Sequence, residues 1–217
     1  MNDEALLAMI ESLTARICHD LVGPVGAIAN GVELLADDPA KPDPEVIQLI
    51  ASSARSASQR LQYFRTSFGS GNALSTTRAL SDARALALTL NEAGKVTVEF
   101  PAPDTDVEAA AGRQVAKILL NLLLVAHECL PRGGGIRVRT TLGADALQMT
   151  IEAEGVQARL ADENRAALTS DPLAHAMSPR GVPARLAQLT AASIGATLRI
   201  EERAGRVALI GKFPRKA

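Results

Sequence analysis

The chain has 217 residues, of which 47% are apolar and 22% charged, and its formal net charge is −1. These values are ordinary for a soluble globular protein of one large or two small domains. The small charge, the absence of tryptophan and an aromatic content of 2% argue against a nucleic-acid-binding surface. The N-terminus is acidic, unlike a secretory signal, and the longest apolar run, 118–126, is too short to span a bilayer. We therefore expect a cytoplasmic protein that binds neither nucleic acid nor membrane.

The first third of the chain is predicted to form a helical hairpin. Residues 3–36 carry an apolar stripe at helical spacing, and the proline-rich segment 37–42 ends that helix. Asp43 and Pro44 mark the start of a second helix that runs to about residue 68 and is followed by a glycine-rich linker. The apolar positions of the two helices are Leu6, Ile10, Leu13, Ile17, Leu21, Ile28, Val32, Leu35, Val46, Ile50, Ala54, Ala57, Leu61, Phe64 and Phe68.

The remainder of the chain predicts an α+β domain in which helices cover one sheet. Its strand candidates show alternating hydrophobicity, and its helix candidates show a period near 3.6. The predicted strands are 95–100, 136–142, 146–152, 196–202 and 206–213, and the predicted helices are about 80–91, 107–130, 158–168 and 179–194. The expected domains are therefore a helical hairpin over 1–70 and a two-layer α/β sandwich over 75–217.

The hairpin cannot bury its apolar stripe alone. Steps of three and four residues on both helices are typical of a bundle seam, which favours a four-helix bundle with a second copy of the chain. The alternative is that the hairpin packs on the α+β domain of its own chain.

His19 is the candidate functional residue of the first helix. At about 100° per residue it lies about 180° from the centre of the apolar stripe, so it should face solvent. A neutral imidazole is a competent nucleophile, and Asp20 could orient the ring or accept its proton. Pro24 is expected to kink the helix nearby. The residues expected to share the face of His19 are Ser12, Ala15, Gly23, Gly26, Asn30 and Glu33.

Gly23 and Gly26 make this face unusual. Each glycine costs a helix roughly 1 kcal/mol relative to alanine, so a helix that only had to fold would avoid both. They would instead let another protein approach His19 closely. The alternative is that His19 is an ordinary solvated histidine.

The other histidines and cysteines show no metal-binding or redox spacing. We expect Cys18 to flank the bundle, His127 to be partly buried or to cap a helix, and His175 to lie in a loop. Cys129 has no paired cysteine at a disulfide-framework or metal spacing. The sequence therefore predicts no metal site.

The run His19-Asp20-Leu21-Val22-Gly23-Pro24, followed by the hairpin, resembles the dimerisation and phosphotransfer domain of sensor histidine kinases. The run Asn121-Leu122-Leu123-Leu124-Val125-Ala126 resembles part of their ATP-binding domain, which has a Bergerat-like fold. Over nearly its full length the chain is similar to the dimeric histidine phosphotransferases of alphaproteobacterial cell-cycle signalling, most strongly in the segment 27–35 that follows the histidine motif.

Departures from the kinase pattern argue against ATP binding. Val125 replaces the asparagine that coordinates Mg²⁺ in such kinases, although Asn121 matches the first asparagine of the motif. The segment 153–157 lacks the adenine-binding aspartate and the second glycine, and 181–185 has one glycine where a phosphate loop has several. These losses remove the contacts that would hold Mg-ATP.

The resemblance thus implies a phosphotransferase that carries phosphate on His19 between the receiver domain of a hybrid kinase and those of response regulators. The receiver would supply Mg²⁺, so this chain is expected to bind no cofactor. Receivers are expected to dock on the His19 face and Val22, with Arg55, Gln59 and Gln62 as a flank and the degenerate domain as a second contact. Two alternatives remain: an ATP-dependent histidine kinase with diverged motifs, and a non-catalytic dimer that binds regulators.

Overall fold

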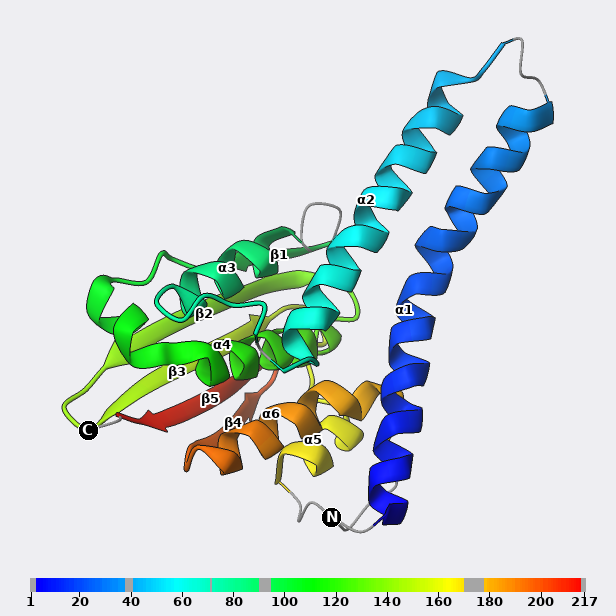
Figure 1. The fold of residues 1–217 in the computed structure, drawn as a ribbon. Coiled ribbons are helices and arrows are strands. Elements are labelled where there is room, and N and C mark those ends of the chain that lie inside the picture. Colours follow the sequence, from blue (N-terminus) through cyan, green and yellow to red (C-terminus); the bar gives the residue numbers. More distant parts are fainter. Residues whose placement is uncertain (1–2, 38–40, 71, 90–94, 170–177, 216–217) are drawn as a thin grey trace.

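The computed structural model describes residues 3–37, 41–70, 72–89, 95–169 and 178–215. A long helical hairpin, α1 (Asp3–Asp37) and α2 (Pro44–Ser67), extends from an α+β unit (Figure 1). α1 continues through Pro24. Asp43 caps α2 by accepting a hydrogen bond from the backbone N–H of Glu45 at 2.8 Å. These observations confirm the hairpin that the sequence predicts.

One mixed sheet forms a layer of the α+β unit. Among the described residues its strands lie in the order β1-β2-β3-β5-β4. β1 runs parallel to β2 because the chain crosses over between them, whereas the β2–β3 and β4–β5 pairs are antiparallel hairpins, and β3 pairs antiparallel with β5. The strands are β1 (Val96–Glu99), β2 (Gly134–Leu142), β3 (Ala146–Glu154), β4 (Thr197–Arg203) and β5 (Arg206–Pro214).

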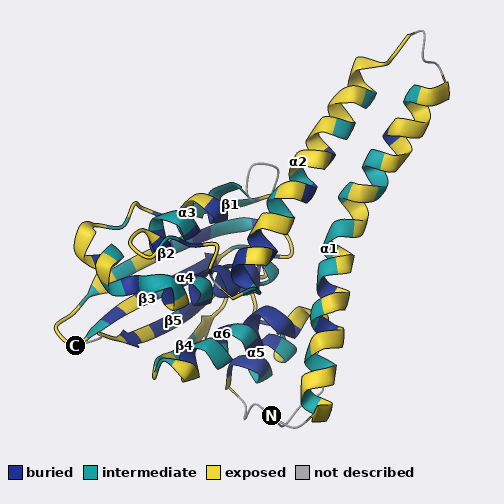
Figure 2. Cartoon of the chain, in the orientation of Figure 1, coloured by how far each residue is buried: buried dark blue, intermediate teal, exposed yellow. Residues whose placement is uncertain are grey.

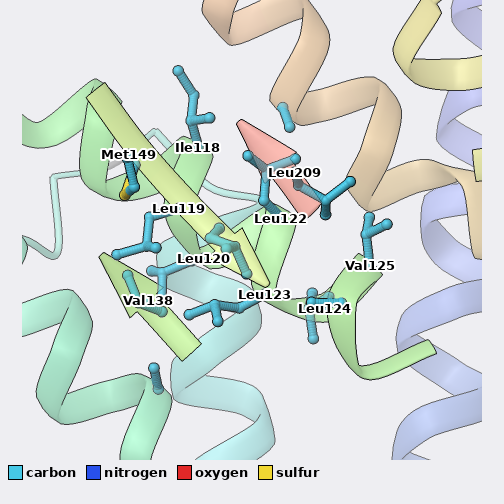
Figure 3. Close-up of a cluster of buried hydrophobic side chains, with 14 of the residues drawn as sticks. Ile118, Leu119, Leu120, Leu122, Leu123, Leu124, Val125, Val138, Met149 and Leu209 are labelled. Carbon is cyan, nitrogen blue, oxygen red and sulfur yellow. The ribbon is translucent and has the colours of Figure 1, made fainter. Parts of the chain in front are cut away.

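Helices form the second layer, on one face of the sheet (Figure 1). The main core lies between α4 and the strands β2, β3 and β5, where side chains such as Met149, Val138 and Leu209 meet the leucines of α4 (Figure 3). The helices of this layer are α3 (Ala79–Thr89), α4 (Thr105–Glu128), α5 (Asp162–Thr169) and α6 (Val182–Ser193), and a 3₁₀ turn, Pro179–Gly181, precedes α6.

α4 is the central core helix. It is long and apolar enough to cross a membrane by length and composition, but 67% of its most apolar window is buried inside the protein. The helix is interrupted at Gly112, whose φ of 63° is accessible to glycine at little cost. Burial of α4 explains the apolar run 118–126.

The predicted helix over 158–168 starts too early. Residues 158–161 belong to no helix or strand, and α5 begins at Asp162. The backbone N–H groups of Arg159 and Leu160 bond to the carbonyl of Cys129 and the carboxylate of Glu202, both at 3.1 Å. These tertiary hydrogen bonds hold the segment out of the helix.

The hairpin packs on its own chain only at its base. Tyr63 and Phe64 of α2 belong to the same buried cluster as α4, and the Tyr63 hydroxyl donates to the carbonyl of Leu120 at 2.6 Å. Towards the tip, α1 and α2 are mostly exposed or half-buried (Figure 2). Large exposed apolar side chains of the hairpin are Leu6, Leu7, Ile10, Val22, Val25, Val32, Leu34, Ile47, Leu49 and Leu61. The hairpin therefore packs on the α+β unit of its own chain at its base, as the alternative expected, but not towards its tip.

Candidate functional site

His19 projects into solvent from the middle of α1. Its side chain is 85% exposed, which confirms the orientation expected from the helical period. Gly23 and Gly26 continue this surface, and a Cβ atom added at either position would meet no atom within 4 Å. By contrast, a Cβ at Gly31 would come within 2.5 Å of Ile50 on α2. Packing within the chain thus explains Gly31 but not the two glycines near His19.

Asp20 orients the imidazole of His19. Successive residues of a helix diverge by about 100°, yet Nδ1 of His19 and Oδ1 of Asp20 lie 3.0 Å apart. An ionised carboxylate can only accept a hydrogen bond, so Nδ1 carries the proton in this pair. In the tautomer with the proton on Nδ1, Nε2 keeps its lone pair, and the side chain that carries it is 85% exposed. The arrangement presents a nucleophilic nitrogen.

The carboxylate of Asp20 accepts a hydrogen bond from Arg16, a residue that was not among the candidates predicted from the sequence. Nε of Arg16 donates to Oδ2 of Asp20 at 2.9 Å, and Nη1 donates to Oε1 of Glu128 at the end of α4. Asn164 of α5 donates to the other oxygen of Glu128 at 2.9 Å. The four-residue spacing of Arg16 and Asp20 on one helix could have predicted their ion pair. No local pattern predicts the pairing of Arg16 with Glu128.

The charge of Arg16 is stabilised by these partners. Its side chain is 11% exposed, and burial alone would lower the pKa of the guanidinium. Glu128 and then Asp20 outweigh that effect, so the pKa of Arg16 is raised above its ordinary value. Arg16 therefore remains a cation between two carboxylates.

Most residues expected on the His19 face are accessible. Ala15, Val22, Gly23, Asn30, Glu33, Arg55 and Gln62 are exposed, and Gly26 and Gln59 are half-buried. Ser12 contradicts the expectation because it is only 7% exposed. The N-terminal half of α1 lies beside the 3₁₀ turn and α6 (Figure 1).

Cys18, His127 and His175 are the other titratable candidates that the sequence singles out. Cys18 is exposed in the single chain, and its place at the flank of a bundle stays a prediction. His127 is half-buried near the end of α4, and burial lowers its pKa to about 4. The prediction for His175 falls outside the described residues.

The segments that resemble a nucleotide site are used for packing. Asn121 is fully buried, and its amide donates to the carbonyls of Ser67 at 2.8 Å and Lys117 at 2.9 Å. Val125 is also fully buried, within the apolar cluster (Figure 3). Gln157 adopts a φ of 66° at the position of the missing second glycine. An apolar side chain at Val125 offers no ligand for Mg²⁺.

The fold and the site define the class of protein. A helical hairpin with an exposed histidine–aspartate pair, joined to a two-layer α+β unit, is the architecture of histidine-kinase-like proteins. The family model for the histidine phosphotransferase C-terminal domain matches residues 80–206. The chain belongs to the histidine phosphotransferase family.

Individual relatives agree with this assignment. The chain is 40% identical over 129 residues to the protein phosphotransferase ChpT of Brucella abortus (strain 2308), a match that covers 58% of each protein. The structure of a bacterial phosphotransferase matches with a TM-score of 0.74 and 29% identity over 94% of this chain and 96% of that one. The histidine kinase AdeS of Acinetobacter baumannii matches with a TM-score of 0.50 and 14% identity, over 92% of this chain and 98% of that one. The last similarity shows a shared fold alone.

Proposed function

We propose that this chain is a phosphohistidine carrier of a two-component phosphorelay. In this role His19 accepts phosphate from the aspartyl phosphate of a hybrid kinase's receiver domain and donates it to the receivers of response regulators, in the cytoplasm. The observation that carries the proposal is the exposed His19 ring, whose Nδ1 is bonded to Asp20 and whose Nε2 keeps its lone pair. Membership of the histidine phosphotransferase family supports it.

The transfer step follows from this geometry. Nε2 of His19 attacks the phosphorus atom of the acyl phosphate, a P–N bond forms, and the P–O bond to the receiver's aspartate breaks. The aspartate leaves as a carboxylate, and the histidine ring becomes a phosphoimidazolium that retains the proton on Nδ1. The negative charge of Asp20 stabilises that cation. Phosphate passes to the next receiver by the reverse of these events.

The proposal assigns no role to ATP. Val125 is apolar and buried where a kinase of this fold has a metal ligand. The side-chain amide of Asn121 already donates hydrogen bonds to the backbone carbonyls of Ser67 and Lys117. Mg²⁺ would be supplied by the acidic pocket of the receiver and would neutralise charge on the transferring phosphoryl group.

Receivers would dock on the small-residue surface around His19. Gly23 and Gly26 leave open space above α1, and Ala15 adds little bulk. Exposed Val22, at 69% exposure, supplies an apolar contact, and Arg55 and Gln59 flank it from α2. The α+β unit, which lies beside the N-terminal half of α1, would provide a second contact (Figure 1).

The proposed carrier is a homodimer. Apolar side chains near the hairpin tip, such as Val32 and Ile47, are 53% and 48% exposed in the single chain. A second hairpin packed against them would form a four-helix bundle and remove that apolar surface from water.

Transfer of label from a phosphorylated receiver tests the proposed function. Candidate receivers from the same genome would be phosphorylated and mixed with the wild-type chain or with His19→Ala. We expect label on the wild type and none on the variant. Label that appears equally on His19→Ala would overturn the assignment of His19.

A further inference from the structure

Arg16 occupies a position between the hairpin and the α+β unit. Its guanidinium contacts Oδ2 of Asp20 on its own helix and Oε1 of Glu128 on α4. Oδ1 of Asp20 is left for Nδ1 of His19, at 3.0 Å. Asn164 holds the second oxygen of Glu128. A continuous line of hydrogen bonds thus joins the reactive ring to α5.

This line is poorly explained by folding alone. Glu128 is the last residue of α4, where the helix dipole disfavours an acidic side chain. Asn164 is 1% exposed, and Arg16 is a largely buried cation. Well-packed apolar residues often replace such buried polar groups at no loss of stability. These groups form one chain of hydrogen bonds, from Asn164 through Glu128 to Arg16, that ends at Asp20.

We propose that Arg16 is a positioning residue, which fixes the Asp20 carboxylate so that Oδ1 selects the Nδ1–H form of His19, and which anchors this pair to the α+β unit through Glu128. The inference rests on the proposed function, in which Nε2 is the nucleophile. It gives the α+β unit a task that needs no nucleotide: to hold the hydrogen-bonded pair at one orientation. A carboxylate released from Arg16 would rotate among several rotamers and hold the ring less often.

The tautomer of His19 can be measured without any receiver. We would label the full chain with ¹⁵N-histidine and record the ring nitrogen shifts of His19 at a pH where the ring is neutral. Wild type should be mostly the Nδ1–H form. Arg16→Met should lower the ratio of the Nδ1–H to the Nε2–H form by about fivefold, the effect of losing roughly one hydrogen bond.

Arg137→Met is the matched control. Arg137 also joins two carboxylates, those of Glu99 and Glu152, but it lies on the sheet. This variant should keep the wild-type ratio. If Arg16→Met lowers the melting temperature yet keeps the wild-type ratio, Arg16 is only structural and the inference is overturned.

Arg16→Lys covers the case in which Arg16→Met does not fold. Lysine keeps the charge but has a single nitrogen, which cannot reproduce the fork that reaches Asp20 and Glu128 together. We expect a folded protein whose ratio is lowered at least twofold. A wild-type ratio in folded Arg16→Lys overturns the inference in that case.

Phosphorylation by phosphoramidate provides a second, receiver-independent readout. Nε2 attacks phosphorus, the P–N bond of the donor breaks and ammonia leaves, so the rate reports the nucleophile alone. Arg16→Met should react severalfold more slowly than wild type and Arg137→Met at the wild-type rate. An effect of Arg16→Met on these probes without any transfer from receivers would support the inference and refute the proposed function. Normal phosphotransfer from receivers, with no effect of Arg16→Met on the tautomer ratio or on the phosphoramidate rate, would support the proposed function and overturn the inference.

Discussion

The side-chain amide of Asn121 donates a hydrogen bond to the backbone carbonyl of Ser67, the last residue of α2, at 2.8 Å. The donor lies in the helix that resembles a kinase nucleotide motif, and the acceptor lies at the base of the hairpin. A residue of the nucleotide motif therefore joins the two parts of the chain. Tyr63 lies four residues before Ser67 on α2, and its hydroxyl donates a hydrogen bond to the carbonyl of Leu120 on α4, which reinforces that joint.

Replacement of Asn121 by leucine should destabilise the protein by about 1–3 kcal/mol, because the buried carbonyl of Ser67 would lose a donor. Urea denaturation measures the free energy of unfolding. Thr14→Ala, which removes an exposed side-chain hydrogen bond to the carbonyl of Ile10, should change it by less than about 0.5 kcal/mol. Equal effects of the two substitutions would contradict the structural role of Asn121.

Added bulk at Gly23 should slow phosphotransfer without harming the fold. No atom of the chain lies within 4 Å of a Cβ at this position, so Gly23→Gln should be neutral or slightly stabilising. Transfer from a phosphorylated receiver should fall about tenfold, which corresponds to about 1.4 kcal/mol. Ala51→Gln, an exposed change on α2, is the control and should transfer normally. Unchanged transfer by Gly23→Gln would place the receiver elsewhere.

A charge at Val32 should dissociate the proposed dimer. Val32 is 53% exposed on α1 near the hairpin tip, and a buried unpaired carboxylate at a bundle seam is strongly unfavourable. Light scattering should give the mass of two chains for wild type and of one chain for Val32→Glu. Val156→Glu, on a residue 73% exposed in the α+β unit, should remain dimeric. A monomeric wild type would refute the bundle.

The buried imidazole of His127 should make stability depend on pH. Burial lowers its pKa from 6.5 to about 4, so the unfolded chain binds a proton more readily than the folded one. The contribution is therefore fully present above pH 6.5 and is lost as the pH falls towards 4. Between pH 7 and pH 4.5 the wild type should lose about 2 kcal/mol more than His127→Gln, as measured by urea denaturation. Parallel losses in both proteins would contradict this.

Local patterns in the sequence predicted the secondary structure well because apolar periodicity and caps are local signals. Asp43 and Pro44 marked the start of α2, and the orientation of His19 followed from the helical period. Ser12 was placed wrongly on an open face: it is 7% exposed, and a helical period alone cannot show burial by elements distant in sequence. The start of α5 was wrong for a similar reason, since the backbone N–H groups of the preceding segment donate to the carbonyl of Cys129 and the carboxylate of Glu202, which are distant in sequence.

The exposed histidine–aspartate contact could be predicted from the sequence, and the side chains that support it could not. His19 and Asp20 are adjacent and belong to a recognisable run, whereas Arg16, Glu128 and Asn164 meet only after folding. Glu128 follows Arg16 by 112 positions, and no local pattern carries that pairing. Val125 could be interpreted from the sequence alone, because an apolar residue at the position of the kinases' Mg²⁺-binding asparagine is visible without the fold.

In the proposed relay, phosphate reaches His19 from another protein and not from ATP. Mass spectrometry that preserves phosphohistidine would locate phosphate after incubation of the chain with a phosphorylated receiver, or with Mg-ATP alone. We predict phosphate on His19 in the first mixture and none in the second. Phosphate on His19 from Mg-ATP alone, or phosphate from the receiver at another residue, would contradict the account.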